Sequence, residues 1–174
     1  MGLLVKHPDV IMTQGTALFM SISLIDALTN HYQLVDKATK KGAIVVPPEL
    51  DFVPGPGEDL ESMIWVLTYT IMLHHHASLQ GSDKADYKRD VIDNFYGSLS
   101  YSGLAEKREF LISRGNNLRA FGPSAWIPDP AEREWFRHAM ALVRGQNELS
   151  LGGSIKPITF DAFDALCDEF DTDE

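Results

Sequence analysis

The longest apolar stretch of the chain predicts one central, buried helix. Residues 63–73 are apolar except for Thr68 and Thr70, and the polar cluster 58–62 precedes them. Apolar residues on every side of a helix indicate that other elements surround it. The run is also well short of the roughly 18 residues that span a bilayer. We therefore expect a core helix from Asp59 to His76, with Asp59 as its N-cap.

Five further segments show apolar residues at helical spacing. The clearest begins with Asp129-Pro130-Ala131-Glu132, which combines an N-cap, a proline at the first helical position and an early acid. The last segment is expected to turn Phe160, Phe163, Leu166, Cys167 and Phe170 inward. The five predicted ranges are 21–28, 83–96, 104–113, 129–145 and 159–170.

The remaining segments are predicted to be connections with little or no sheet. Residues 29–58 form a long connection that contains four prolines, and 42–46 is either a strand or a tethered loop. A short strand is expected at 3–5. Gly55-Pro56-Gly57 predicts a turn. A connection as long as 29–58 is usually functional or mobile. The 174 residues thus predict a mainly α fold in a single domain.

Charge narrows the range of partners. The formal net charge is −10, but seven acids and no base lie in 161–174, and the rest carries 18 acids against 15 bases. No basic stripe is visible, which argues against nucleic acid and anionic membrane as partners. The acidic end is expected to be a solvated helix and tail.

Cysteine usage and the first residues bear on the compartment. Cys167 is the single cysteine, so it forms no internal disulfide and no cysteine metal cluster. The few apolar residues after Met1 are followed at once by Lys6 and His7, unlike a secretory signal. We therefore expect an intracellular protein, cytoplasmic or nuclear.

Common catalytic patterns do not occur in the sequence. His74, His75 and His76 are consecutive, so on a helix they point about 100° apart and do not converge on one metal ion. The sequence has no G-x-S-x-G motif and no glycine-rich phosphate loop. Cys167 lies in an acidic helix, where its pKa is expected to rise. The residues alone predict no catalytic, cofactor-binding or metal site.

Two stretches resemble motifs of a known protein family: GTALFMSI at 15–22 and DLESMIWVL at 59–67. In this order they resemble the C-terminal lobe of the fungal-type protein kinase family, in which the first motif closes the activation loop and the second starts the central helix. The likeness runs over 2–111. The residues that carry it are Gly15, Thr16, Phe19, Met20, Asp59, Leu60, Glu61, Ser62 and Trp65.

The resemblance implies supporting roles for two of these residues. Asp59 would accept hydrogen bonds from backbone N–H groups of a catalytic loop, and Thr16 would lie in the loop that receives substrate. Their plain alternatives are an N-cap and a turn threonine. Full-length members are ATP-dependent serine/threonine kinases, so ATP and Mg²⁺ are expected only for such a member.

Departures from the family pattern predict that this chain is inactive by itself. Phosphoryl transfer needs a phosphate loop, a lysine, a catalytic aspartate and a magnesium-binding aspartate. The chain begins after the first three, and Lys6 stands near the fourth position with the wrong charge for Mg²⁺. Ser23 replaces a glutamate that usually makes a buried ion pair, and Glu58 replaces a common histidine.

Four interpretations stay open at this point. The chain is a truncated or degenerate kinase lobe, or a helical interaction module that binds a protein partner on the exposed lobe surface. It is alternatively a portion of an intact kinase, or an unrelated helical fold with coincidental motifs. The sequence does not predict the oligomeric state.

Overall fold

All of the regular secondary structure in the described part of the chain is helical. The computed structural model describes residues 19–41, 52–97, 101–114, 127, 129–147 and 156–168, and no strand occurs within these ranges. The predicted mainly α fold is therefore confirmed, while the predicted strands at 3–5 and 42–46 lie outside the described residues. The elements are α2 (Ile22–Lys40), α3 (Pro56–Ser78), α4 (Gly81–Tyr87), the π-helical turn η1 (Lys88–Ile92), α5 (Asp93–Tyr96), α6 (Tyr101–Arg114), α7 (Pro130–Asn147) and α8 (Phe160–Asp168).

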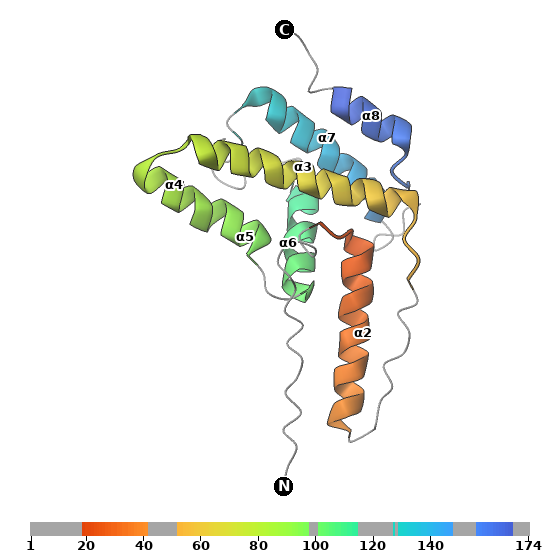
Figure 1. The fold of residues 1–174 in the computed structure, drawn as a ribbon. Coiled ribbons are helices and arrows are strands. Elements are labelled where there is room, and N and C mark those ends of the chain that lie inside the picture. Colours follow the sequence, from red (N-terminus) through yellow and green to blue (C-terminus); the bar gives the residue numbers. More distant parts are fainter. Residues whose placement is uncertain are drawn as a thin grey trace.

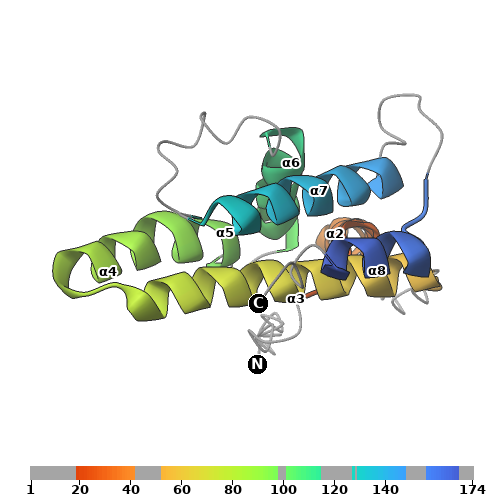
Figure 2. The ribbon, with the colours of Figure 1, turned by 90° about the horizontal axis from the view of Figure 1, so that it is seen from above.

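Helix α3 runs across the middle of the bundle (Figure 1). Helix α7 lies along one side of α3, and α8 packs on α7. Helix α6 contacts α7, α5 and α2. Helix α2 projects away from the other helices, and α3 lies along one edge when the bundle is seen from above (Figure 2).

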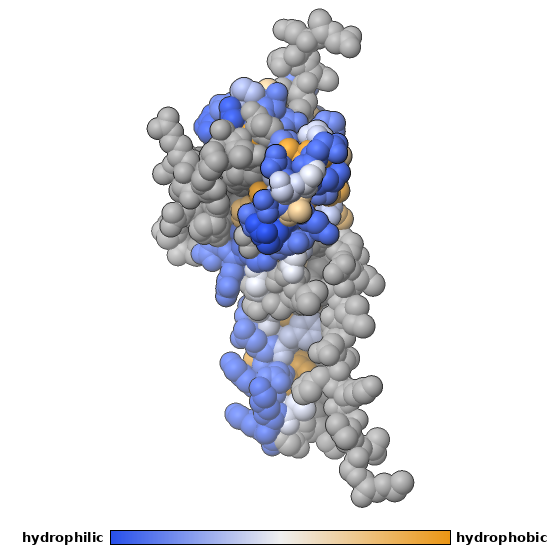
Figure 3. Space-filling model, turned by 90° about the vertical axis from the view of Figure 1, so that its left-hand side faces the viewer, coloured by the Kyte–Doolittle hydropathy of each residue, from blue (hydrophilic) through white to orange (hydrophobic). Residues whose placement is uncertain are grey.

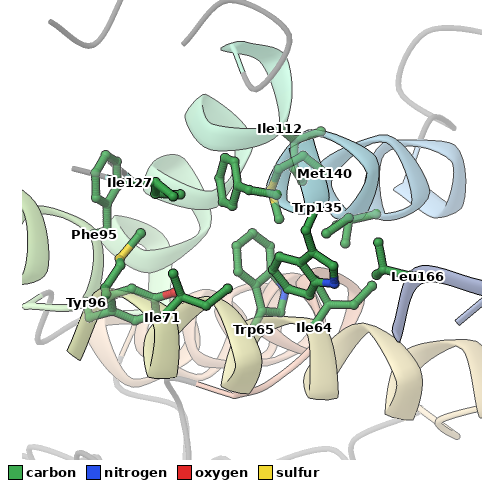
Figure 4. Close-up of a cluster of buried hydrophobic side chains, with 14 of the residues drawn as sticks. Ile64, Trp65, Ile71, Phe95, Tyr96, Ile112, Ile127, Trp135, Met140 and Leu166 are labelled. Atoms are coloured by element: carbon green, nitrogen blue, oxygen red, sulfur yellow. The ribbon is translucent and has the colours of Figure 1, made fainter. Parts of the chain in front are cut away.

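The main core lies between α3 and α7 (Figure 4). Trp65 and Ile64 of α3 meet Trp135, Phe136 and other fully buried side chains of α7. A second, smaller cluster joins Ile25 of α2 to Leu104 of α6. Helix α2 is therefore attached to the rest mainly through its first turns.

Helix α2 is longer than predicted. The structure continues it from Ile22 to Lys40, so residues 29–40 are helical and the predicted connection 29–58 is shorter than expected. Apolar spacing continues past Leu28 to Tyr32 and Val35, which the sequence interpretation did not follow. The pair Lys40–Asp36, 2.6 Å apart at helical spacing, also suits a helix at this point.

Helix α3 also begins earlier than predicted, so the assignment of Asp59 as its N-cap is wrong. Gly55 is the N-cap, and Pro56 occupies the first helical position. The Gly55 backbone N–H donates to Glu58 Oε2 at 2.9 Å, because Glu58 stands three residues into the helix. Gly57 is consequently part of the first helical turn, not of a preceding turn.

The expectation that other elements cover α3 on every side is wrong within the described residues. Met63, Val66 and Leu73 are exposed by 51%, 39% and 40%. The buried half of the helix includes Glu61, whose side chain is fully enclosed. The polar cluster at the start of α3 therefore contributes to the core, and part of the apolar run does not.

The 83–96 segment forms three successive elements and not one helix. It begins at Gly81, whose φ of +59° suits glycine, and the π-helical turn η1 separates α4 from α5. The predicted apolar stripe is confirmed for Tyr87, Ile92, Phe95 and Tyr96, which are buried. The sequence thus predicted which side of the segment is buried. It did not predict the π-helical turn.

The last two helices largely follow their predictions. Asp129 Oδ1 accepts the N–H groups of Ala131 and Glu132 at 2.7 and 3.0 Å, which confirms this N-cap, and α7 runs past Gly145 to Asn147. In α8, Phe163 and Leu166 are buried as expected.

Phe160 was expected to face inward and does not. It is 63% exposed, because it opens α8 beside the capping residue Thr159, whose hydroxyl accepts the N–H of Ala162 at 3.2 Å. Cys167 is half-buried and packs against the main core, and Phe170 lies outside the described residues.

Candidate functional site

A buried carboxylate on α3 accepts four hydrogen bonds from the described residues. Glu61 Oε1 accepts the backbone N–H of Ile22 at 2.8 Å and the indole N–H of Trp65 at 3.1 Å. Glu61 Oε2 accepts amide N–H groups from Gln146 at 2.9 Å and Asn147 at 3.1 Å. We call Glu61 and these four donors the Glu61 cluster. It joins the start of α2, the first half of α3 and the end of α7.

The local structure explains why a carboxylate stands here. Ile22 is the first residue of α2, and backbone N–H groups at a helix start have no partner inside the helix. Ser21 caps α2 by accepting the N–H of Leu24 at 3.3 Å, and Glu61 satisfies the N–H of Ile22. The partial positive charge at this helix start also favours a nearby anion.

A buried arginine accompanies the cluster. Arg108 of α6 is 1% exposed, and its guanidinium lies over the Trp65 ring, 4.5 Å from the ring centroid. Its Nη1 donates to the backbone oxygen of Met20. Burial lowers the pKa of Arg108 to about 10, with the charge of Glu61 among the opposing influences. Arg108 is therefore still positively charged at neutral pH and balances a buried negative charge.

Burial and hydrogen bonding act in opposite directions on Glu61. Burial is the larger influence and leaves the pKa of its carboxyl group raised, although Trp65, Asn147, the Ile22 N–H and the charge of Arg108 act to lower it. Each carboxylate oxygen already accepts two N–H groups, so a proton on either oxygen would face a donor. The geometry thus suits the ionised form, as expected for a carboxylate that accepts several hydrogen bonds. All of these contacts hold helices together and leave Glu61 enclosed.

Aromatic rings extend the contact between the segment before α2 and α3. The ring of Phe19 meets that of Tyr69 edge-on, with centroids 6.0 Å apart. Tyr69 in turn meets Tyr96 of α5 at 4.7 Å. Edge-to-face pairs at these distances are favourable. Phe19 therefore packs against the outer part of the core.

Gly57 permits the close approach of α7 to the start of α3. A Cβ atom on Gly57 would lie 2.5 Å from Gln146 Oε1. That oxygen already accepts the N–H of Ile158 at 3.0 Å, and the other end of the same amide donates to Glu61. Gln146 is therefore held at both ends and has little freedom to move away.

Substitution of Gly57 by alanine is expected to lower the free energy of unfolding by about 1–3 kcal/mol. The added methyl group would displace the Gln146 amide from Ile158, from Glu61 or from both. Chemical denaturation followed by circular dichroism measures the loss. Gly145→Ala is the matched control, since a Cβ there meets no atom closer than 3.7 Å. Equal losses for both variants would contradict the close-approach argument.

The structure places the residues of the two motifs as follows. Gly15 and Thr16 lie outside the described residues. Phe19 and Met20 contact α3 and α6, Leu60 and Trp65 are buried in the core, and the Ser62 hydroxyl donates to the Glu58 backbone oxygen at 2.9 Å. Asp59 is exposed in the first turn of α3 and makes no side-chain hydrogen bond within the described residues. Its predicted anchoring role stays a prediction.

Sequence reasoning missed the importance of Glu61, Arg108, Gln146 and Asn147. A signal for Glu61 existed, because it stands three and four residues before the apolar Ile64 and Trp65 and so shares their face of α3. The partners on α6 and α7 had no such signal. They are 47 to 86 residues away from Glu61 in the chain, and only the packing of the helices brings them close.

The histidines at the end of α3 contact an aromatic ring. His75 and His76 lie against Tyr87, with ring centroids 4.8 and 6.4 Å apart. Within the described ranges, no group of three or more His, Cys, Asp or Glu residues is arranged to hold a metal ion. None of the helices described is both long and apolar enough to cross a membrane.

Comparison of the chain with protein-family models, with curated proteins and with solved structures gives no match.

Proposed function

We propose that this chain is a helical domain of the kinase C-lobe type that does not transfer phosphate by itself. The observation that carries the proposal is the meeting of the two motif segments at the Glu61 cluster. Ile22, the last residue of the first motif, donates to Glu61 of the second motif across 39 positions of sequence.

Two further contacts support the same pairing of the motifs. Arg108 lies on Trp65 of the second motif and donates to the Met20 backbone of the first. Phe19 of the first motif packs on Tyr69, shortly after the second. Two motifs that matched by coincidence would have no reason to share one buried cluster. Their contact favours the interpretation that both motifs belong to one domain of the kinase C-lobe type.

The chemistry of the cluster favours a supporting role. A general base must reach the proton that it removes, and Glu61 is fully enclosed by four N–H donors. Phosphoryl transfer also depends on carboxylates that hold Mg²⁺ at the phosphates. Lys6 stands near the position where the family has such an aspartate, and a cation there would repel the metal ion.

Mg·ATP is expected to produce no saturable heat when it is titrated into the purified 174-residue chain up to about 1 mM. A radiolabelled-phosphate assay with a generic protein substrate is expected to show no transfer above the protein-free control. Saturable binding in the micromolar range would contradict the proposal that the chain does not transfer phosphate by itself. An experimental structure in which α3 does not superpose on the central helix of a kinase lobe would contradict the kinase part.

A second candidate function is that of a docking module for another protein. The exposed positions Met63, Val66 and Leu73 favour it, because they form a row of large apolar side chains on a helix at the edge of the bundle (Figure 2). Exposed apolar side chains gathered on one side of a helix are typical of interaction sites. By contrast, the end of the bundle near α4 shows a mainly hydrophilic surface with scattered apolar areas (Figure 3).

A further inference from the structure

The exposed positions of α3 are spaced as in the seam of a coiled coil. The residues exposed along its outer side are Asp59, Met63, Val66, Thr70, Leu73 and Ala77. The intervals between them are four, three, four, three and four, so they repeat every 3.5 residues on average. This spacing is the a/d pattern through which one helix packs on another. We call these six residues the α3 seam.

The α3 seam is fitted for burial although a polar residue stands at its centre. The Thr70 hydroxyl donates to the Val66 backbone oxygen at 2.9 Å, so its donor is already satisfied within the helix. Thr70 can therefore be covered without leaving an unpaired hydroxyl donor. Beside the seam, the Ser62 and Ser78 hydroxyls also donate to backbone oxygens of α3.

We propose that the α3 seam packs against the α3 seam of a second copy of this chain, with the two helices antiparallel. The proposal rests on the docking function and names its partner. A helical partner follows from the heptad spacing. A second copy follows from the distribution of polar groups along α3, which has hydrogen-bond-accepting acids at its start and histidines that can donate an N–H at its end.

Hydrogen-bonding groups and the helix dipoles favour the antiparallel pair of copies. Glu58 and Asp59 lie in the first turn of α3, and His75 and His76 lie in the last turn, directly after His74. Antiparallel packing brings the acidic end of each helix beside the histidine end of the other. It also places the opposite ends of the two helix dipoles together. Parallel packing would instead bring the acids of both copies together.

The seam also has a register that fits a two-fold axis. If the axis passes beside Thr68, Val66 of one copy lies opposite Thr70 of the other, and Met63 lies opposite Leu73. Asp59 then faces Ala77, with His74 one turn away. Met63 thus meets Leu73 and Val66 meets Thr70 near the centre, while Ala77 meets Asp59 at each end. Every contact occurs twice, as a two-fold interface requires.

The size of the seam limits the strength of the dimer. A helix of 23 residues is about 34 Å long, and a single helix pair covers less than the roughly 800 Å² per partner of a standard interface. We therefore expect a reversible dimer with a dissociation constant on the order of 10 µM.

Sedimentation velocity of the full chain between about 1 and 300 µM tests the proposal. The wild-type chain is expected to shift from monomer to dimer across this range. The double variant Val66→Glu, Leu73→Glu places like charges in the seam and is expected to weaken dimerisation by at least about 100-fold, with an unchanged circular dichroism spectrum. Leu34→Glu is the matched control, because Leu34 is 59% exposed on α2 and lies off the seam. It is expected to dimerise like wild type.

Cysteine pairing tests the orientation. In a background with Cys167→Ser, a mixture of Val66→Cys and Thr70→Cys chains is expected to form a disulfide between the two kinds of chain. A parallel pair would instead link Thr70→Cys chains to one another, which would overturn the antiparallel arrangement.

Three outcomes would overturn the dimer: a monomer at every concentration, a dimer that survives the double glutamate variant, or a dimer lost equally in Leu34→Glu. A monomeric chain whose α3 seam binds a different helical protein would overturn the second copy as partner while leaving the docking function intact. Failure of both kinds of binding would count against the docking function itself.

Discussion

Replacement of Glu61 by alanine is expected to lower the free energy of unfolding by about 3–5 kcal/mol, the range found when one member of a buried charged pair is removed. The change leaves the N–H groups of Ile22, Trp65, Gln146 and Asn147 without their acceptor and Arg108 without the nearby negative charge. Urea denaturation followed by tryptophan fluorescence measures the loss. Since Trp65 itself donates to Glu61, its emission should also change in the folded variant.

Asp59→Ala is the matched control for this prediction. Asp59 stands two residues earlier on the same helix and is exposed. Its loss is expected to cost no more than about 1 kcal/mol, the contribution of an acid near a helix start. The difference between the two losses distinguishes an acid buried in the Glu61 cluster from one that only interacts favourably with the helix dipole. A loss for Glu61→Ala as small as that for Asp59→Ala would show that the cluster contributes little to stability.

Arg108→Ala is expected to lower the free energy of unfolding by about 3–5 kcal/mol, because it removes the positive charge that accompanies Glu61. It leaves Glu61 buried without a nearby positive charge, removes the hydrogen bond to Met20 and exposes one face of Trp65 to an empty space. Arg108→Lys is expected to recover only part of the loss, since an ammonium group does not stack on an indole as a guanidinium does. The free energy of unfolding from chemical denaturation gives both values.

Lys107→Ala serves as the control for Arg108. Lys107 is the preceding residue of α6, and among the described residues its amino group makes a long, exposed contact of 3.4 Å with the Asp93 backbone oxygen. Its loss is expected to stay within about 0.5 kcal/mol. A double-mutant cycle of Glu61→Gln and Arg108→Met then isolates their coupling, which should be between about 0.5 and 3 kcal/mol. Strictly additive effects would show that the two charges do not stabilise each other.

The helices were predictable from sequence because their signals are local. Asp129 and Pro130 mark the start of α7, and the apolar spacing of Phe163 and Leu166 fixes the buried face of α8. The boundary errors have local causes as well. At α3, a proline preceded by glycine was interpreted as a turn, although proline is favoured at the first helical position.

The candidate site was much less predictable, because its partners are distant in the chain. Glu61 was noted only as part of a family motif, and its buried position depends on α7 and on Arg108 from α6. An arginine amid the polar residues of a helix gives no sign that it will be buried. Likewise, the apolar run of α3 predicted burial all round, and sequence pattern alone does not say whether the same chain or another molecule covers the outer side.

The π-helical turn η1 decides which residues of the α4–α5 segment can face the core. In a continuous α-helix, eight residues of separation would leave Tyr87 and Phe95 about 80° apart around the axis. A π turn advances less around the axis with each residue, and both side chains are buried in one cluster. The segment thus contains one residue more than an α-helix of the same span would use. Winding and chain length are therefore linked here. Ordinary α-helical winding of the same residues would turn Phe95 away from Tyr87, whereas deletion of one residue would leave the two side chains seven positions apart and only about 20° from alignment.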